Sequence, residues 1–219
     1  MNGEDILILA AYIISAAILV RLPLIGRHVT VLHTLVHETG HALTALMFDG
    51  EVKSMKLFSN SEGVILTGSR SSMARIMTSL AGYPFSSGIS LIFFILLSNG
   101  HAEWVFYSLF LLAAAALLFW VRNMYGMIWC AAFLALLGWV LSTGSSAWVT
   151  GVSMLLAGTV LVQSLYSAFH ILCLSFKNPG EAGDASSLEQ FTFIPAQVWG
   201  IAFFGTALAA FAAVCFTCI

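Results

Sequence analysis

The chain has 219 residues, of which 60% are apolar and only 8% are charged, and its formal net charge at pH 7 is −2. Because a soluble domain carries roughly 25% charged residues, this composition excludes a globular domain surrounded by water. It predicts a polytopic membrane protein, and the small negative charge argues against binding to nucleic acid. The acidic start "MNGED", with no small-residue cleavage site after the first apolar segment, predicts that no signal peptide is cleaved.

Seven apolar segments are long enough to cross a bilayer as helices, which takes roughly 17–25 residues. In chain order they cover about 5–22, 29–48, 74–98, 102–121, 123–141, 147–173 and 196–218. The sequence therefore predicts an all-α polytopic fold with about seven transmembrane helices, forming a single membrane-embedded domain over residues 1–219.

Two connections between these segments are long. In the first, 49–73, the stretches "EVKSMKLF" and "GVILTG" alternate in polarity around the turn signal "SNSEG", which predicts a β-hairpin over 51–68. The second, 174–195, contains "KNPGEAGDASS", whose proline and glycines end the sixth helix. Four predicted helices separate the two loops, so both should emerge on the same face of the membrane.

The lysines and arginines predict the orientation, because cytoplasmic loops are enriched in them. With the N-terminus inside and the C-terminus outside, the inside loops hold Lys53, Lys56, Arg70, Arg75, Arg122 and Lys177, and the outside loops hold Arg21 and Arg27. We therefore expect a cytoplasmic N-terminus.

The second segment, "VTVLHTLVHETGHALTALMF", carries three histidines at four-residue intervals. Ionisable groups inside a spanning helix are costly and usually mark function. The helical repeat places His33, His37 and His41 on one face, each about 6 Å above the next. Zinc–nitrogen bonds are about 2.0–2.1 Å long, so two neighbouring histidines can share one ion but all three cannot.

Glu38 selects the pair, because His37-Glu38-Thr39-Gly40-His41 is an HExxH motif. In this motif two imidazoles hold zinc, and the glutamate acts as general base on the water that the metal activates. The other pair, His33 with His37, would have Thr34 in the glutamate's place, and threonine cannot take up a proton. His33 is therefore expected to line the cavity, and Gly40 to let a neighbouring backbone or a substrate strand approach.

A catalytic zinc usually takes a third protein ligand. Asp49 lies roughly 12 Å beyond His41 along the same helix and cannot reach the same ion. The remaining carboxylates near this face are Glu51, Glu62, Glu181, Asp184 and Glu189. Spacing does not choose among those of the second loop. "DASSLEQ" also reads as a helix start, with Asp184 or Ser186 as N-cap and Glu189 closing a capping box.

The order of these features resembles the site-2 protease family of intramembrane zinc metalloproteases, in particular its small multi-spanning bacterial branch. The similarity rests on HExGH in an early helix, the hairpin after it, "AGYP" at 81–84, "RN" at 122–123, and "DASSL" followed by "IPAQVW". It covers residues 30–200 and implies that Asp184 is the third ligand. Two features depart from the family: "NPGEAGDA" replaces its LDG or NPDG, and Phe85 stands where a small residue is expected.

The resemblance implies a Zn²⁺-dependent endopeptidase that cleaves transmembrane or membrane-associated proteins, in a bacterial inner membrane, with an active site that opens towards the cytoplasm. Asn123 could then hydrogen-bond a substrate backbone or the loop that bears Asp184, or could simply end a helix. Two alternatives keep the histidine motif: a membrane metal-ion transporter or metal-binding protein, and a catalytically silent pseudoprotease.

Overall fold

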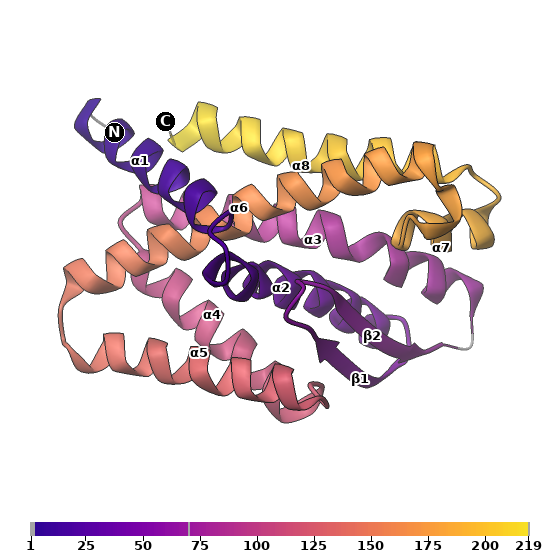
Figure 1. Cartoon of the computed structure of the whole chain (residues 1–219), viewed down its shortest axis with the longest axis horizontal. Coiled ribbons are helices and arrows are strands. Elements are labelled where there is room, and N and C mark those ends of the chain that lie inside the picture. Colours follow the sequence, from indigo (N-terminus) through magenta and orange to yellow (C-terminus); the bar gives the residue numbers. More distant parts are fainter. Residues whose placement is uncertain (1–2, 70, 219) are drawn as a thin grey trace.

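The structure, a computed structural model, describes residues 3–69 and 71–218. Over these ranges it consists of helices and one two-stranded hairpin (Figure 1). In chain order the elements are α1 (Gly3–Leu19), α2 (Ile25–Met47), β1 (Glu51–Leu57), β2 (Gly63–Gly68), α3 (Ser72–Ser98), α4 (Ala102–Phe119), α5 (Met124–Ser142), α6 (Ser146–Lys177), a short 3-10 turn (Pro179–Glu181), α7 (Asp184–Thr192) and α8 (Ala196–Cys218). Each apolar segment of the sequence therefore forms a helix, and the predicted hairpin is confirmed.

Five of these helices are long and apolar enough to cross a membrane: α3, α4, α5, α6 and α8. They support an integral membrane protein. The apolar part of α1, Ile6–Leu19, is shorter, and α2 carries the polar histidine motif. Among the described residues, length and composition therefore support five spanning helices, whereas the sequence predicts about seven.

The ends of the chain do not lie as the sequence predicted. α1 begins and α8 ends at the same end of the molecule, whereas the hairpin and α7 lie towards the other end (Figure 1). α1 packs mainly against α6 and only slightly against α2. The segment 20–24 therefore links two helices that pack little against each other. The two ends of the chain therefore lie near each other, whereas the sequence predicts that they lie on opposite faces of the membrane.

α2 packs mainly against α3 and also against α6, and the hairpin lies against it (Figure 1). From Thr30 to Ala42 every residue except His37 is buried. This placement follows from polarity, since a helix that carries histidine, glutamate and threonine is costly to expose to lipid. The apolar helices around it present their own outer faces to the bilayer.

The hairpin is an antiparallel pair with one irregularity between Val52 and Ser54. Its turn is tied to α2, because Thr34 Oγ1 donates to the Ser61 carbonyl at 2.8 Å and the Thr30 and Ser61 hydroxyls contact each other. The outer side of β1 is in contact with the connection between α4 and α5. The hairpin is therefore fixed to the helical bundle on two sides.

The second long loop folds back to the bundle as α7, which packs against α3 and α8. The N-cap of α7 is Gly183, with φ 53°, and makes no side-chain cap hydrogen bond. The predicted capping box is therefore wrong. Asp184 is the first helical residue, and the Ser186 hydroxyl donates to the Pro179 carbonyl. The left-handed turn at Gly183 thus leaves the Asp184 side chain free for another partner.

Candidate metal centre

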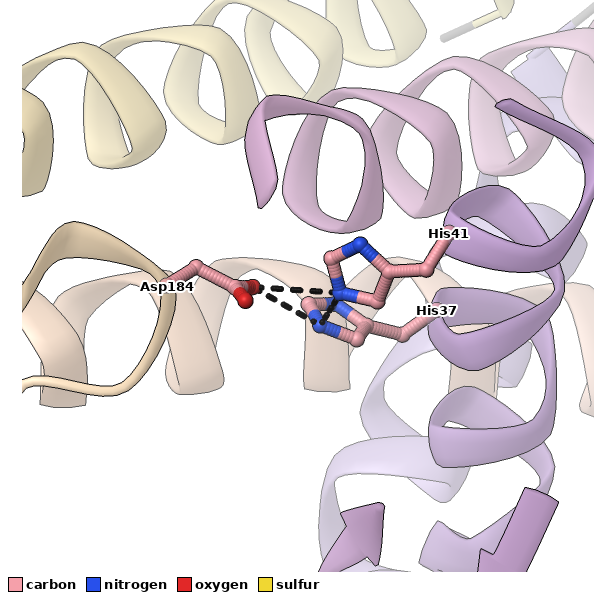
Figure 2. A group of neighbouring side chains, drawn as sticks. All are labelled: His37, His41 and Asp184. Carbon is pink, nitrogen blue, oxygen red and sulfur yellow. Dashed lines mark hydrogen bonds and ion pairs between the residues drawn. The ribbon is translucent and has the colours of Figure 1, made fainter. Parts of the chain in front are cut away.

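The two histidines of the HExxH motif lie side by side on α2. One helical turn separates them, and their Nε2 atoms are 3.0 Å apart (Figure 2). Both rings point away from the helix towards α7 (Figure 2). The helix therefore presents two imidazole nitrogens to one point in space.

Asp184 on α7 completes a triangle of donor atoms. Its Oδ2 lies 3.2 Å from His37 Nε2 and 3.2 Å from His41 Nε2 (Figure 2). Donors about 2.1 Å from a tetrahedral zinc ion are roughly 3.4 Å from one another, so this triangle has nearly the size that one ion requires. Two imidazoles and one carboxylate are also the donor set of a catalytic zinc site. The three side chains therefore fit the group that the sequence implies.

The charge of Asp184 suits a metal ligand. Burial by itself would raise the pKa of this carboxyl, but the interactions with His41 and His37 outweigh burial and hold its pKa well below the usual range. The carboxyl is consequently ionised at neutral pH, which is the form that binds a cation.

The ring of His41 is oriented by α3. Its Nδ1 donates to the backbone carbonyl of Thr78 at 2.6 Å, because a carbonyl only accepts. This bond places a proton on Nδ1, so that Nε2 is the ring nitrogen available to a metal ion. His37 Nδ1 is buried and has no hydrogen-bond partner among the described residues. The ring of His37 instead packs edge-on against Tyr83, with the ring centroids 4.5 Å apart.

Gly82 provides the space for the two histidines. A Cβ at Gly82 would overlap the His37 ring and lie 2.5 Å from His41 Nε2. From the sequence, the segment "AGYP" contributes only to the family resemblance, and no role is predicted for its residues. The signal that could have indicated a role is the position of Gly82 and Tyr83, one helical turn beyond Thr78 in an apolar helix. On this face α3 contributes the Thr78 carbonyl, the space at Gly82 and the Tyr83 ring to the site.

Glu38 lies beside the triangle and is only 6% exposed. Its carboxylate has no hydrogen-bond or ion-pair partner in the described parts of the chain, so it is free to accept a proton. β2 passes close to it, since a Cβ at Gly63 would lie 2.5 Å from Glu38 Oε1. The general-base candidate is therefore enclosed between its own helix and the hairpin.

All of these groups open into one pocket of about 650 Å³ between α2, β2, α3, α6 and the α7 region. Its wall includes Glu38, His33, Tyr83, Ser167 and His170. His33 is buried, with its Nε2 3.4 Å from the Ser167 hydroxyl. The pocket is thus lined by polar groups that can hold water, although it lies within an apolar bundle.

Gly40 and Asn123, which the sequence suggested as possible contacts of a substrate, have other neighbours in the structure. The open side of Gly40 is filled by Phe85, to whose Cβ an added methyl group would come within 2.7 Å. Gly40 therefore accommodates a side chain of α3, which also explains the large residue after "AGYP". Asn123 contacts neither the pocket nor the Asp184 loop, because its amide is hydrogen-bonded to Leu57 in β1.

The rival carboxylates lie outside the donor triangle. Glu51 pairs with Lys53 at 3.3 Å on the hairpin, and Glu181 and Glu62 lie in the pocket wall. Among the described residues, the one group of three or more side chains spaced for a metal ion is His37, His41 and Asp184.

Comparison with known proteins gives one family. The sequence model described as Peptidase M50B-like matches residues 9–214. No curated protein and no solved structure matches the chain. Because the family match covers nearly the whole sequence and includes both histidines and Asp184, the chain belongs to the Peptidase M50B-like family.

Proposed function

We propose that the protein is a zinc-dependent intramembrane endopeptidase. The observation that carries the proposal is the triangle of His37 Nε2, His41 Nε2 and Asp184 Oδ2 with the unpartnered Glu38 carboxylate next to it. The family membership supports peptidase chemistry, and the five apolar helices support action within the membrane.

His37, His41 and Asp184 would hold the ion, which supplies a Lewis acid that activates water and polarises the scissile carbonyl. Glu38 accepts a proton from the attacking water and passes it to the leaving amine. The Thr78 carbonyl keeps His41 in the required tautomer. His33 and Ser167 line the pocket through which water reaches Glu38.

The substrates are transmembrane or membrane-associated proteins. A helical peptide bond is shielded from attack, so the substrate must be extended before it is cut. β2 supports this step, since it lines the pocket beside Glu38 and can pair with an extended chain by strand addition.

The distribution of charge supports a cytoplasmic active site. The hairpin, the first turn of α3, the α4–α5 connection and the end of α6 carry Lys53, Lys56, Arg75, Arg122 and Lys177. By the positive-inside rule this end would face the cytoplasm, and the resemblance to the bacterial branch of the family implies an inner membrane. With α1 beginning at the opposite end, the N-terminus then lies on the outer face.

Replacing Glu38 with Gln tests the proposal. The Glu38→Gln variant should keep stoichiometric zinc, measured by elemental analysis, and lose cleavage of an unfolded protein such as β-casein by about 10²–10⁴-fold. Glu103→Gln on α4, where Glu103 pairs with the exposed His101 at 3.4 Å, is the matched control and should cleave normally.

Metal analysis of two further variants tests the third ligand. Asp184→Asn should lose zinc, and Glu181→Gln in the same pocket wall should retain it. A transporter would keep much of its metal flux in Glu38→Gln, and a pseudoprotease would bind zinc without cleavage in the wild type. Either result would contradict the proposal.

A further inference from the structure

The connection between α4 and α5 runs along the outer edge of β1 like a short third strand. The Met55 amide donates to the Trp120 carbonyl at 2.7 Å, and the Arg122 amide donates to the Met55 carbonyl at 3.0 Å. Two residues further along β1, the Leu57 amide donates to Asn123 Oδ1 at 3.1 Å, and Asn123 Nδ2 donates to the Leu57 carbonyl at 2.7 Å. Residues 120–123, here called the clamp, therefore satisfy both backbone groups of two strand residues.

Asn123 makes these bonds in place of an ordinary helix cap. It stands at the N-cap of α5, where an asparagine side chain usually accepts from the first turn, but it makes no cap hydrogen bond. Gly126 leaves room for this orientation, since a Cβ there would lie 2.6 Å from Asn123 Oδ1 and 3.4 Å from Leu57 Cβ. The side chain thus serves the hairpin and not its own helix.

The clamp determines which edge of the hairpin is open. In an antiparallel pair, opposed residues direct their N–H and C=O groups either towards each other or both outwards. Met55 and Leu57 direct theirs outwards to the clamp, and their partners across the pair are Ile65 and Gly63. Ile65 and Gly63 therefore direct their own N–H and C=O groups to the opposite edge, away from β1.

That opposite edge faces the pocket. Gly63, Val64, Ile65 and Thr67 of β2 all line it, and Gly63 is the residue that lies against Glu38. An extended chain added to β2 would therefore run past the general-base candidate, paired with alternate residues of the strand.

We propose that the clamp closes the β1 edge and fixes the hairpin, so that a substrate strand pairs only with Gly63 and Ile65 of β2, with Asn123 as a positioning residue. This inference rests on the proposed protease function for its substrate. The attachment of β1 to the clamp can be tested separately from cleavage.

The test uses the full-length protein in detergent and two variants that perturb the clamp differently. Asn123→Ser can still cap α5 but cannot bridge the Leu57 amide and carbonyl. Gly126→Ala favours the helix and displaces the Asn123 amide. Asn99→Ser is the matched control, because Asn99 caps α3 through the Ile95 carbonyl and does not contact the hairpin.

Hydrogen exchange measures the first effect. The Leu57 amide should exchange about tenfold faster in Asn123→Ser and in Gly126→Ala, and at the wild-type rate in Asn99→Ser. Unchanged exchange at Leu57 in both clamp variants would overturn the proposal. This outcome does not depend on whether the protein cleaves anything.

Cleavage of β-casein, read by mass spectrometry, measures the second effect. The clamp variants should retain zinc, lose about tenfold in kcat/KM, and cut at more positions than the wild type, because a loosened hairpin allows the paired strand to slip. Wild-type cleavage sites and rates, despite faster exchange at Leu57, would refute the positioning role. If the wild type with bound zinc cleaves nothing, the proposed function fails, and the exchange experiment still decides whether the clamp holds β1.

Discussion

Replacing Gly82 with Ala should damage the metal centre without damaging the helix that carries it. The added Cβ would overlap the His37 ring and lie 2.5 Å from His41 Nε2, whereas ordinary contacts begin at 3.4 Å. His41 would have to retreat by about 0.9 Å, although its ring is fixed from behind by the Thr78 carbonyl. Metal–ligand distances tolerate changes of only about 0.2 Å. We therefore expect zinc affinity to fall by about 10–100-fold or more, the range seen when the groups that orient a ligand are disturbed.

The assay is a zinc competition titration with a chelator, with elemental analysis of the purified protein. Gly88→Ala is the control, because Gly88 lies in the same helix and a Cβ there meets nothing within 4 Å. Both substitutions favour the helix by up to about 1 kcal/mol, so helix propensity cannot separate them. If Gly82→Ala bound zinc as tightly as Gly88→Ala, the placement of α3 against the two histidines would be wrong.

Two further predictions concern the packing around the site. Gly40→Ala should destabilise the protein by about 1–3 kcal/mol through overlap with Phe85. The double variant Gly40→Ala/Phe85→Leu should recover part of this loss in a thermal unfolding assay. Equal stability of the wild type and Gly40→Ala would contradict the close contact. Gly183→Ala should strain the turn that presents Asp184, at a cost of about 1–3 kcal/mol, and weaken zinc binding in the same titration. Gly180→Ala in the same loop, where a Cβ is unobstructed, should leave zinc binding unchanged, and similar behaviour of the two variants would argue against the strained turn.

The local sequence pattern was sufficient to predict those features that depend only on residues near one another in the chain. The alternation in "EVKSMKLF" and "GVILTG" predicted the hairpin, and the apolar segments predicted the helices, because both signals arise within one element. The HExxH spacing likewise brings His37 and His41 together on one turn of α2. The rise per residue limits the ion to two neighbouring histidines, and the position of Glu38 then excludes His33 from the pair.

Contacts between residues that are distant in the sequence could not be predicted from local spacing. Spacing left Glu181, Asp184 and Glu189 equivalent, since all three follow the same helix. Only resemblance to a family favoured Asp184. Local rules also failed for the start of α7, where Gly183 takes the cap position, and for Asn123, whose amide bonds a strand 66 residues away. In both cases a tertiary contact replaced the local hydrogen bond that the sequence suggested. α1 likewise finds its main partner in α6, which is distant in the chain, and not in the neighbouring α2.

An open strand edge and an ionisable helix face would each be costly in lipid, since unpaired backbone groups and charges lack partners there. The fold places the two against the same pocket, so that one hydrated space serves both. The clamp on β1 extends this arrangement, because it pairs the backbone groups of Met55 and Leu57 at the other strand edge. Among the hairpin residues that line the pocket, the exposed backbone is then that of β2, next to Glu38. The same constraint that forbids free backbone groups in a membrane thus leaves the edge beside Glu38 as the place where a substrate chain can pair.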